Sequence, residues 1–176
     1  MTTTTTKVKP KKIYGNELKL RQVQVIALLH PKLIHMESWV KFGNGSKALL
    51  DNPTTPECGS TGCLAGLRVA LDNGGIPRRN ENYINLFDEG MESFEITEPQ
   101  AKRLFYTDEW PVKFRKPISK LTNERHELER EQFSYAYRNW WSDEQRAEHD
   151  VKIEVIHTAY ARVVAERVEH FINTGR

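Results

Sequence analysis

The chain has 176 residues, of which 38% are apolar and 28% are charged, and its formal net charge is +2. This length is enough to bury one hydrophobic core, and so small a net charge excludes the strong basic field of proteins that bind nucleic acids non-specifically. No apolar stretch is long enough to cross a bilayer, the first residues carry no secretory signal, and two cysteines do not make a disulfide scaffold. We therefore expect a soluble, cytoplasmic protein that does not act at a membrane.

The N-terminal segment is polar, and the first predicted helix follows it. Residues 1–12 combine a run of threonines with four lysines, so we expect a disordered basic tail there and a single domain over 13–176. Asn16 is a good N-cap and Pro31 stops a helix, which predicts a helix over about 16–30. The apolar stripe of this helix is expected to consist of Leu18, Val25, Leu28 and Leu29.

A buried central helix is predicted close to the two cysteines. The stretch ECGSTGCLAGLRVAL contains both of them, Cys58 and Cys63. Its apolar and small residues recur at helical spacing and predict a helix over about 61–72, with Ser60 or Thr61 as its N-cap. We interpret the stretch chiefly as the tight entry to this helix, with the thiols packed in the core.

Three other functions of the same stretch are open alternatives. A thiolate at a helix N-terminus is stabilised by the helix dipole and could serve a cysteine-dependent hydrolase, with a histidine as the base. A zinc site would need His30 and His35 beside the two thiols, but the thiols do not have CxxC spacing, so no metal is assigned. The backbone N–H groups of the turn could bind a small anion, such as a nucleotide, with Arg68 supplying charge. The residues of this candidate ligand site are Gly59, Ser60, Thr61, Gly62 and Arg68.

The next segments are also predicted to be helical. Thr97 is a good N-cap for a short helix, and Trp110 beyond it is expected to fill the core. A linker containing Pro117 should follow, because proline interrupts a helix. A polar helix is then predicted to start at Thr122.

A long helix is predicted at the end of the sequence. Ser142 and Gln145 have the spacing of a capping box, apolar residues continue at helical spacing to about residue 173, and Gly175 is a natural stop. Taken together, the segments predict a mainly α fold. We expect a compact helical single domain with a buried central helix, a long C-terminal helix and a disordered N-terminal tail.

An aromatic and basic cluster precedes this last helix. Residues 133–141 read FSYAYRNWW, with Arg138 among the aromatic residues. Because Trp140 and Trp141 are consecutive, both rings cannot lie on one narrow helix stripe, and one is expected at the surface or against another chain. We therefore predict partner binding by Arg138, Trp140 and Trp141, with homodimerisation through this region and the C-terminal helices as a hypothesis.

Four stretches resemble a group of uncharacterised small proteins from phages and actinobacteria-like hosts. They are LKLRQVQVIALLHPKLIHMESW, ECGSTGCLAGLRVAL, TEPQAKRLFYTDEWP and ARVVAERVEHFINTG, in this order, and the resemblance that they mark extends over roughly two thirds of the chain. The group shares a Cys-Gly-Thr/Ser-x-x-Cys-x-Ala-Gly block, a Gln-Ala-x-x-Leu-Phe segment and a C-terminal Arg-Val/Ile-x-x-Phe-Ile helix. Leu67, where the group has an aromatic residue, and the 116–150 region depart from this pattern. The resemblance implies a phage or mobile-element protein and no particular activity.

These observations predict a small accessory protein that acts as a binding module on a host protein or on a small anionic ligand. If it is phage-encoded, we expect it in the host cytoplasm. One alternative is a cysteine-dependent hydrolase that uses Cys58 or Cys63. Another is a nucleic-acid-binding protein that uses the basic tail and the Arg/aromatic cluster, against which the small net charge argues. No catalytic residue and no cofactor are assigned.

Overall fold

The structure is a computed structural model that describes residues 14–37, 40–41, 47–48, 61–74, 76–77, 86–133 and 141–176. Across these ranges the fold is mainly α, as the sequence predicts. The α-helices are α1 (Glu17–Leu29), α2 (Leu64–Asn73), α3 (Leu86–Ser93), α4 (Glu98–Phe105), α5 (Val112–Phe133) and α7 (Asp143–Thr174), with short 3₁₀ helices η1 (Pro31–Leu33) and η2 (Thr107–Glu109). The predicted tail, residues 1–12, lies outside the described residues.

Short strands accompany the first helices. Strand β1 (Val40–Lys41) pairs antiparallel with β3 (Thr61–Gly62), and β2 (Lys47–Ala48) pairs antiparallel with β4 (Ile76–Pro77). Because β3 ends immediately before Cys63, its pairing fixes the point at which α2 enters the core.

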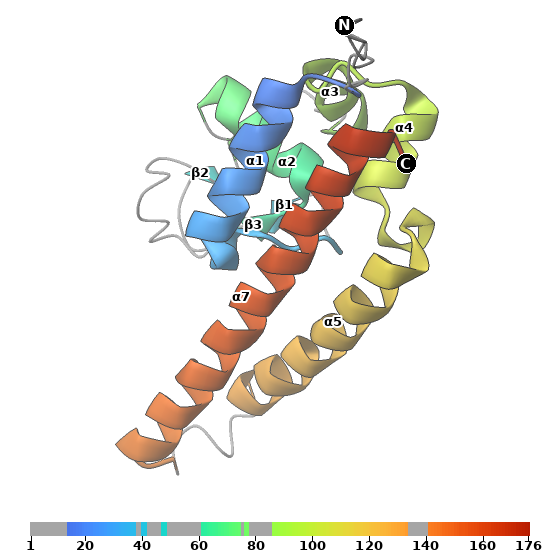
Figure 1. The fold of residues 1–176 in the computed structure, drawn as a ribbon. Coiled ribbons are helices and arrows are strands. Elements are labelled where there is room, and N and C mark those ends of the chain that lie inside the picture. Colours follow the sequence, from blue (N-terminus) through green and yellow to red (C-terminus); the bar gives the residue numbers. More distant parts are fainter. Residues whose placement is uncertain are drawn as a thin grey trace, which may run out of the picture.

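Helix α7 runs along the length of the molecule and organises the other elements (Figure 1). Helix α5 lies antiparallel beside it, and the two extend together away from the body formed by α1–α4. Helix α1 packs on the C-terminal half of α7, while α2 packs on α3. Among the described helices, none is both long and apolar enough to cross a membrane.

Helix α2 is the buried central helix that the sequence predicts. Its residues from Leu64 to Ala70 are all buried. It begins three residues later than predicted, because Thr61 and Gly62 belong to β3. At its other end Gly74 adopts a left-handed conformation with φ of +67°, which glycine does without strain.

The predicted bounds of α1 are confirmed, but the predicted buried face is wrong. Asn16 caps the helix, since its side chain accepts a hydrogen bond from the Lys19 backbone N–H at 3.1 Å. The buried side chains of α1 are Leu20, Val23 and Ala27, whereas the predicted stripe of Leu18, Val25, Leu28 and Leu29 is 49–69% exposed. The helix carries apolar residues on two opposite faces, and contacts with α7 decide which face is buried.

The predicted linker around Pro117 is wrong as well. Pro117 lies inside α5, which begins at Val112 and not at Thr122. Proline removes one hydrogen bond from the helix. Phe114 and Ile118 lie one turn apart on the same face and are 7% and 2% exposed. Their burial offsets the lost hydrogen bond and holds the helix through the proline.

The predicted caps of the later helices, the burial of Trp110 and the end of the last helix are confirmed. Capping boxes form at Thr97 and at Ser142, each with a glutamine three residues later. Trp110 is 2% exposed, and its indole N–H donates to the Leu104 carbonyl oxygen at 3.1 Å. Gly175 ends α7 with φ of +67°.

Candidate functional site

The thiol at the start of α2 is a buried capping group. Cys63 is 3% exposed, and its Sγ accepts a hydrogen bond from the Gly66 backbone N–H at 3.5 Å. Cys63 therefore caps the helix in place of the predicted Ser60 or Thr61. Backbone hydrogen bonds favour the thiolate, but burial outweighs them and raises the pKa of Cys63 to about 11. At neutral pH this thiol is protonated, and a protonated thiol is a poor nucleophile.

Arg68, which was predicted to bind an anion, is bonded within the fold. Its guanidinium donates to the Gln22 side-chain oxygen at 2.8 Å and to both carboxylate oxygens of Asp72, one turn further along α2. Burial tends to raise the pKa of Asp72, but the hydrogen bonds from Arg68 and Ser93 outweigh it and lower the pKa. The side chain thus points toward the C-terminal end of α2, away from the Gly62 end.

The rest of the glycine-rich stretch is described only in part, and its Gly62 contacts the segment that follows η1. Cys58, Gly59 and Ser60 lie outside the described residues. The Gly62 carbonyl oxygen accepts a hydrogen bond from the His35 backbone N–H at 2.9 Å. The entry to α2 therefore holds the segment that follows η1.

Residues 34–37 are also held from the side of α7. The Tyr160 hydroxyl accepts a hydrogen bond from the Met36 backbone N–H at 3.0 Å, and Tyr160 is 1% exposed. This buried anchor, together with the bond to Gly62, fixes the segment between α2 and α7. His35 and Glu37 are thereby presented to α5.

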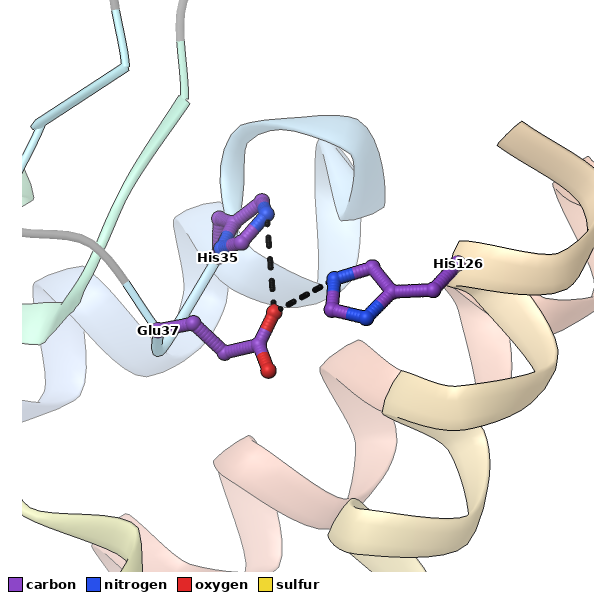
Figure 2. Close-up of side chains that lie close together, drawn as sticks. All are labelled: His35, Glu37 and His126. Atoms are coloured by element: carbon purple, nitrogen blue, oxygen red, sulfur yellow. Dashed lines mark ion pairs between the residues drawn. The ribbon is translucent and has the colours of Figure 1, made fainter. Parts of the chain in front are cut away.

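A cluster of two histidines and a glutamate forms where this segment meets α5. Figure 2 shows the His35 and His126 rings directed at the Glu37 carboxylate. The distance from His126 Nε2 to Glu37 Oε2 is 2.8 Å, and that from His35 Nε2 to the same oxygen is 3.9 Å. The His35 side chain is 10% exposed, Glu37 36% and His126 43%, so the cluster has a buried end and an open rim.

Arg125 lies at the buried end of this cluster, next to His35. Its Nη2 lies 2.8 Å from His35 Nε2 and 3.4 Å from Glu37 Oε2, and its side chain is 2% exposed. Because guanidinium only donates, His35 Nε2 must be the acceptor of this hydrogen bond. The guanidinium also lies 4.9 Å from the centre of the Tyr160 ring, and its Nε is 3.6 Å from Glu129 Oε1. The cluster thus places two imidazole nitrogens and a carboxylate oxygen, which are atoms that can bind a metal ion, next to the positive charge of Arg125.

Sequence reasoning missed most of this cluster. It considered His35 as a zinc ligand beside the cysteines, and His35 and His126 as two of six histidines that could act as the base for a thiol, but it gave Glu37 no function. The one local signal is the His-x-Glu spacing of His35 and Glu37, since His126 is 91 positions beyond His35 and its proximity depends on the packing of α5.

A groove of about 690 Å³ lies on another face, between α1, α5 and α7. Leu28, Phe114 and Ala165 supply apolar lining, and Lys113, Arg162 and Glu166 supply charge. The Lys113 ammonium lies 3.5 Å from His170 Nδ1. Burial, aided by the Lys113 charge, lowers the pKa of His170.

Only one residue of the predicted aromatic partner site is described. Trp141 is half-buried, and its ring centre lies 4.8 Å from that of His149 on α7. Arg138 and Trp140 lie outside the described residues.

Comparisons with known proteins give no relative of this chain. No protein-family model matches it, no curated protein matches it, and no solved structure matches it.

Proposed function

We propose that this protein is a binding module that holds a partner protein against the outward face of α1 and the adjoining groove. We call Leu18, Val25, Leu28 and Leu29 the α1 face. The proposal rests mainly on the exposure of these four side chains, at 69%, 51%, 49% and 68%.

The α1 face has the pattern of a helix-binding surface. Leu18, Val25 and Leu29 are separated by seven and four residues, so they align along one side of the helix. An apolar stripe of this kind is the surface on which an amphipathic helix docks, and contiguous exposed apolar residues mark interaction sites. The opposite side of α1 is already occupied by the core.

The groove beside the α1 face favours the same kind of partner. Leu28 belongs to both surfaces, which makes them continuous. Glu169 at the groove is paired with Arg21, while Lys113, Arg162 and Glu166 bring charges of both signs to its lining. We therefore propose as the occupant an amphipathic helix of a partner protein, with charged residues of both signs beside its apolar stripe. The resemblance to small phage proteins makes a host protein the expected source of that helix.

The other functions predicted from the sequence have less support. A hydrolase that uses Cys63 would need a thiolate, and burial holds the pKa of this thiol at about 11. Binding of a small anion by residues 59–62 stays a prediction, but Arg68 is bonded to Asp72 and Gln22. Nucleic-acid binding also stays a prediction, because the tail and most of the Arg/aromatic cluster lie outside the described residues and Trp141 of this cluster packs against His149.

The experiment compares the proteins that three versions of the chain capture from producing cells. One is the wild type, one is Leu18→Glu/Val25→Glu on the α1 face, and one is the control Val151→Glu/Val155→Glu. The control changes two valines of α7 that are 63% and 62% exposed. Exposed substitutions of this kind change the free energy of unfolding by about 0.5 kcal/mol or less each, and circular dichroism checks that all three proteins fold.

The proposal predicts a protein that the wild type and the control capture and the α1-face variant does not. If all three versions retain the same proteins in the same amounts, the α1 face does not bind a partner.

A further inference from the structure

We infer that His35, Glu37 and His126 form a binding site for a divalent metal ion, with Zn²⁺ as the best fit. This inference is independent of the α1 face. Two imidazole nitrogens and one carboxylate oxygen are a donor set that suits zinc. Within the described ranges this is the one group of three such side chains whose ligand atoms all lie within 4.8 Å of one another.

The distances are close to those that a tetrahedral zinc site needs. Bonds of about 2.0–2.2 Å from zinc to nitrogen and oxygen place neighbouring ligand atoms roughly 3.4 Å apart. The observed distances to Glu37 Oε2 are 2.8 Å from His126 Nε2 and 3.9 Å from His35 Nε2. Each therefore has to change by about half an ångström, which small rotations of the partly exposed Glu37 and His126 side chains can supply.

The surroundings fix one ligand and leave access to the others. His35 is the buried ligand, and the hydrogen bonds of residues 34–37 to Gly62 and Tyr160 hold its backbone. Glu37 and His126 lie at the open rim, so an ion can enter from solvent. Three protein ligands leave a fourth position for water or another small ligand, as in zinc sites that are not closed.

Arg125 competes with the metal ion for the space between the ligand atoms. Its Nη2, at 2.8 Å from His35 Nε2 and 3.4 Å from Glu37 Oε2, occupies the space in which the ion would lie. When a metal binds, the guanidinium has to withdraw. Glu129, whose Oε1 is 3.6 Å from Arg125 Nε, is the carboxylate next to it. We therefore expect the ion to bind less tightly than it would without Arg125, and Arg125→Gln to increase the affinity.

The test is a titration of untagged protein with Zn²⁺ by calorimetry, and with Co²⁺ as a spectroscopic probe of the ligands. We expect one ion per chain, with cobalt bands typical of nitrogen and oxygen ligands. His126→Ala and Glu37→Gln should each weaken binding at least about tenfold. The control is His170→Ala, which removes a histidine of the groove on α7 and should bind as the wild type does.

His126→Ala and Glu37→Gln change partly exposed side chains, so both variants should fold even if Arg125→Gln, which changes a buried side chain, does not. The inference is overturned if the folded wild type binds no ion stoichiometrically. It is also overturned if both His126→Ala and Glu37→Gln bind as tightly as the wild type, or if cobalt shows thiolate charge-transfer bands.

Discussion

At the scale of single residues, burial decides the chemistry of the thiol. The sequence places Cys63 at a helix start, where the dipole and backbone N–H groups favour a thiolate. Those hydrogen bonds are present, but the side chain is 3% exposed and desolvation of the charged form prevails. Helix position can be predicted from local sequence, whereas burial depends on the elements that pack around α2.

The raised pKa predicts that native Cys63 resists alkylation. With a pKa of about 11, the thiolate fraction at pH 8 is on the order of one in a thousand. In a Cys58→Ser background, we expect iodoacetamide to label the native protein very slowly at pH 8, and faster as the pH rises toward 11. Mass spectrometry of the labelled chain measures the rate, and the protein unfolded in urea provides the control. Equal rates for the native and unfolded protein at pH 8 would contradict the account.

At the scale of elements, the helix ends that carry a local cap were predictable, whereas the start of α5 and the buried face of α1 were not. Asn16 and the two capping boxes act through neighbours three residues away, so the sequence specifies them locally. The buried face of α1 and the passage of α5 through Pro117 depend on contacts with distant segments. Where a helix carries apolar residues on two sides, periodicity alone cannot decide between them.

The contact between α2 and α3 gives a prediction at this scale. A Cβ added at Gly90 would lie 2.7 Å from the Ala65 Cβ and 3.2 Å from its Cα. Gly90→Ala should therefore lower the free energy of unfolding by about 1–3 kcal/mol, although alanine is the better helix former. Urea denaturation measures the change.

A double-mutant cycle attributes that loss to the contact. Ala65→Gly removes the atom nearest to the added methyl group, so it should recover part of the loss in the Gly90→Ala background. Strictly additive effects of the two substitutions would show that the helices do not approach each other this closely.

At the scale of the whole molecule, residues far apart in the sequence form the cluster of His35, Glu37 and His126 and its surroundings. His35 and Glu37 follow η1, Arg125 and His126 lie on α5, and Tyr160 lies on α7. No local sequence pattern predicts that these three segments meet, because their contact depends on how α5 and α7 pack. The mainly α fold, in contrast, follows from helical periodicity and caps, and so could be predicted.

Tyr160 tests whether the segment after η1 is anchored as described. Tyr160→Phe leaves the Met36 backbone N–H without its buried hydroxyl acceptor, and we expect the free energy of unfolding to fall by about 1–3 kcal/mol. Thermal or urea denaturation measures the loss. Tyr106→Phe, at a side chain that is 40% exposed, is the control and should have a smaller effect. An unchanged stability of Tyr160→Phe would show that α7 does not hold this segment.

Homodimerisation stays a prediction at this scale. The C-terminal half of α7 is buried against the rest of the fold, whereas Val151 and Val155 in its N-terminal half are exposed. Trp141 contacts His149 in the same half of α7. A dimer through this end would have twice the 20.5 kDa mass of the chain, and Val155→Glu should reduce that mass by half. Light scattering across a wide concentration range measures it, and a constant mass of one chain would contradict the hypothesis.

The central claim is that the α1 face binds a partner protein, and site-specific photo-crosslinking in producing cells tests it most directly. A photoreactive amino acid is placed at Val25, which is 51% exposed on α1, or at Val155, which is 62% exposed on α7. We predict that Val25 gives a discrete covalent adduct with one other protein and that Val155 does not give that adduct. No adduct from Val25, or the same adduct from both positions, would contradict the claim.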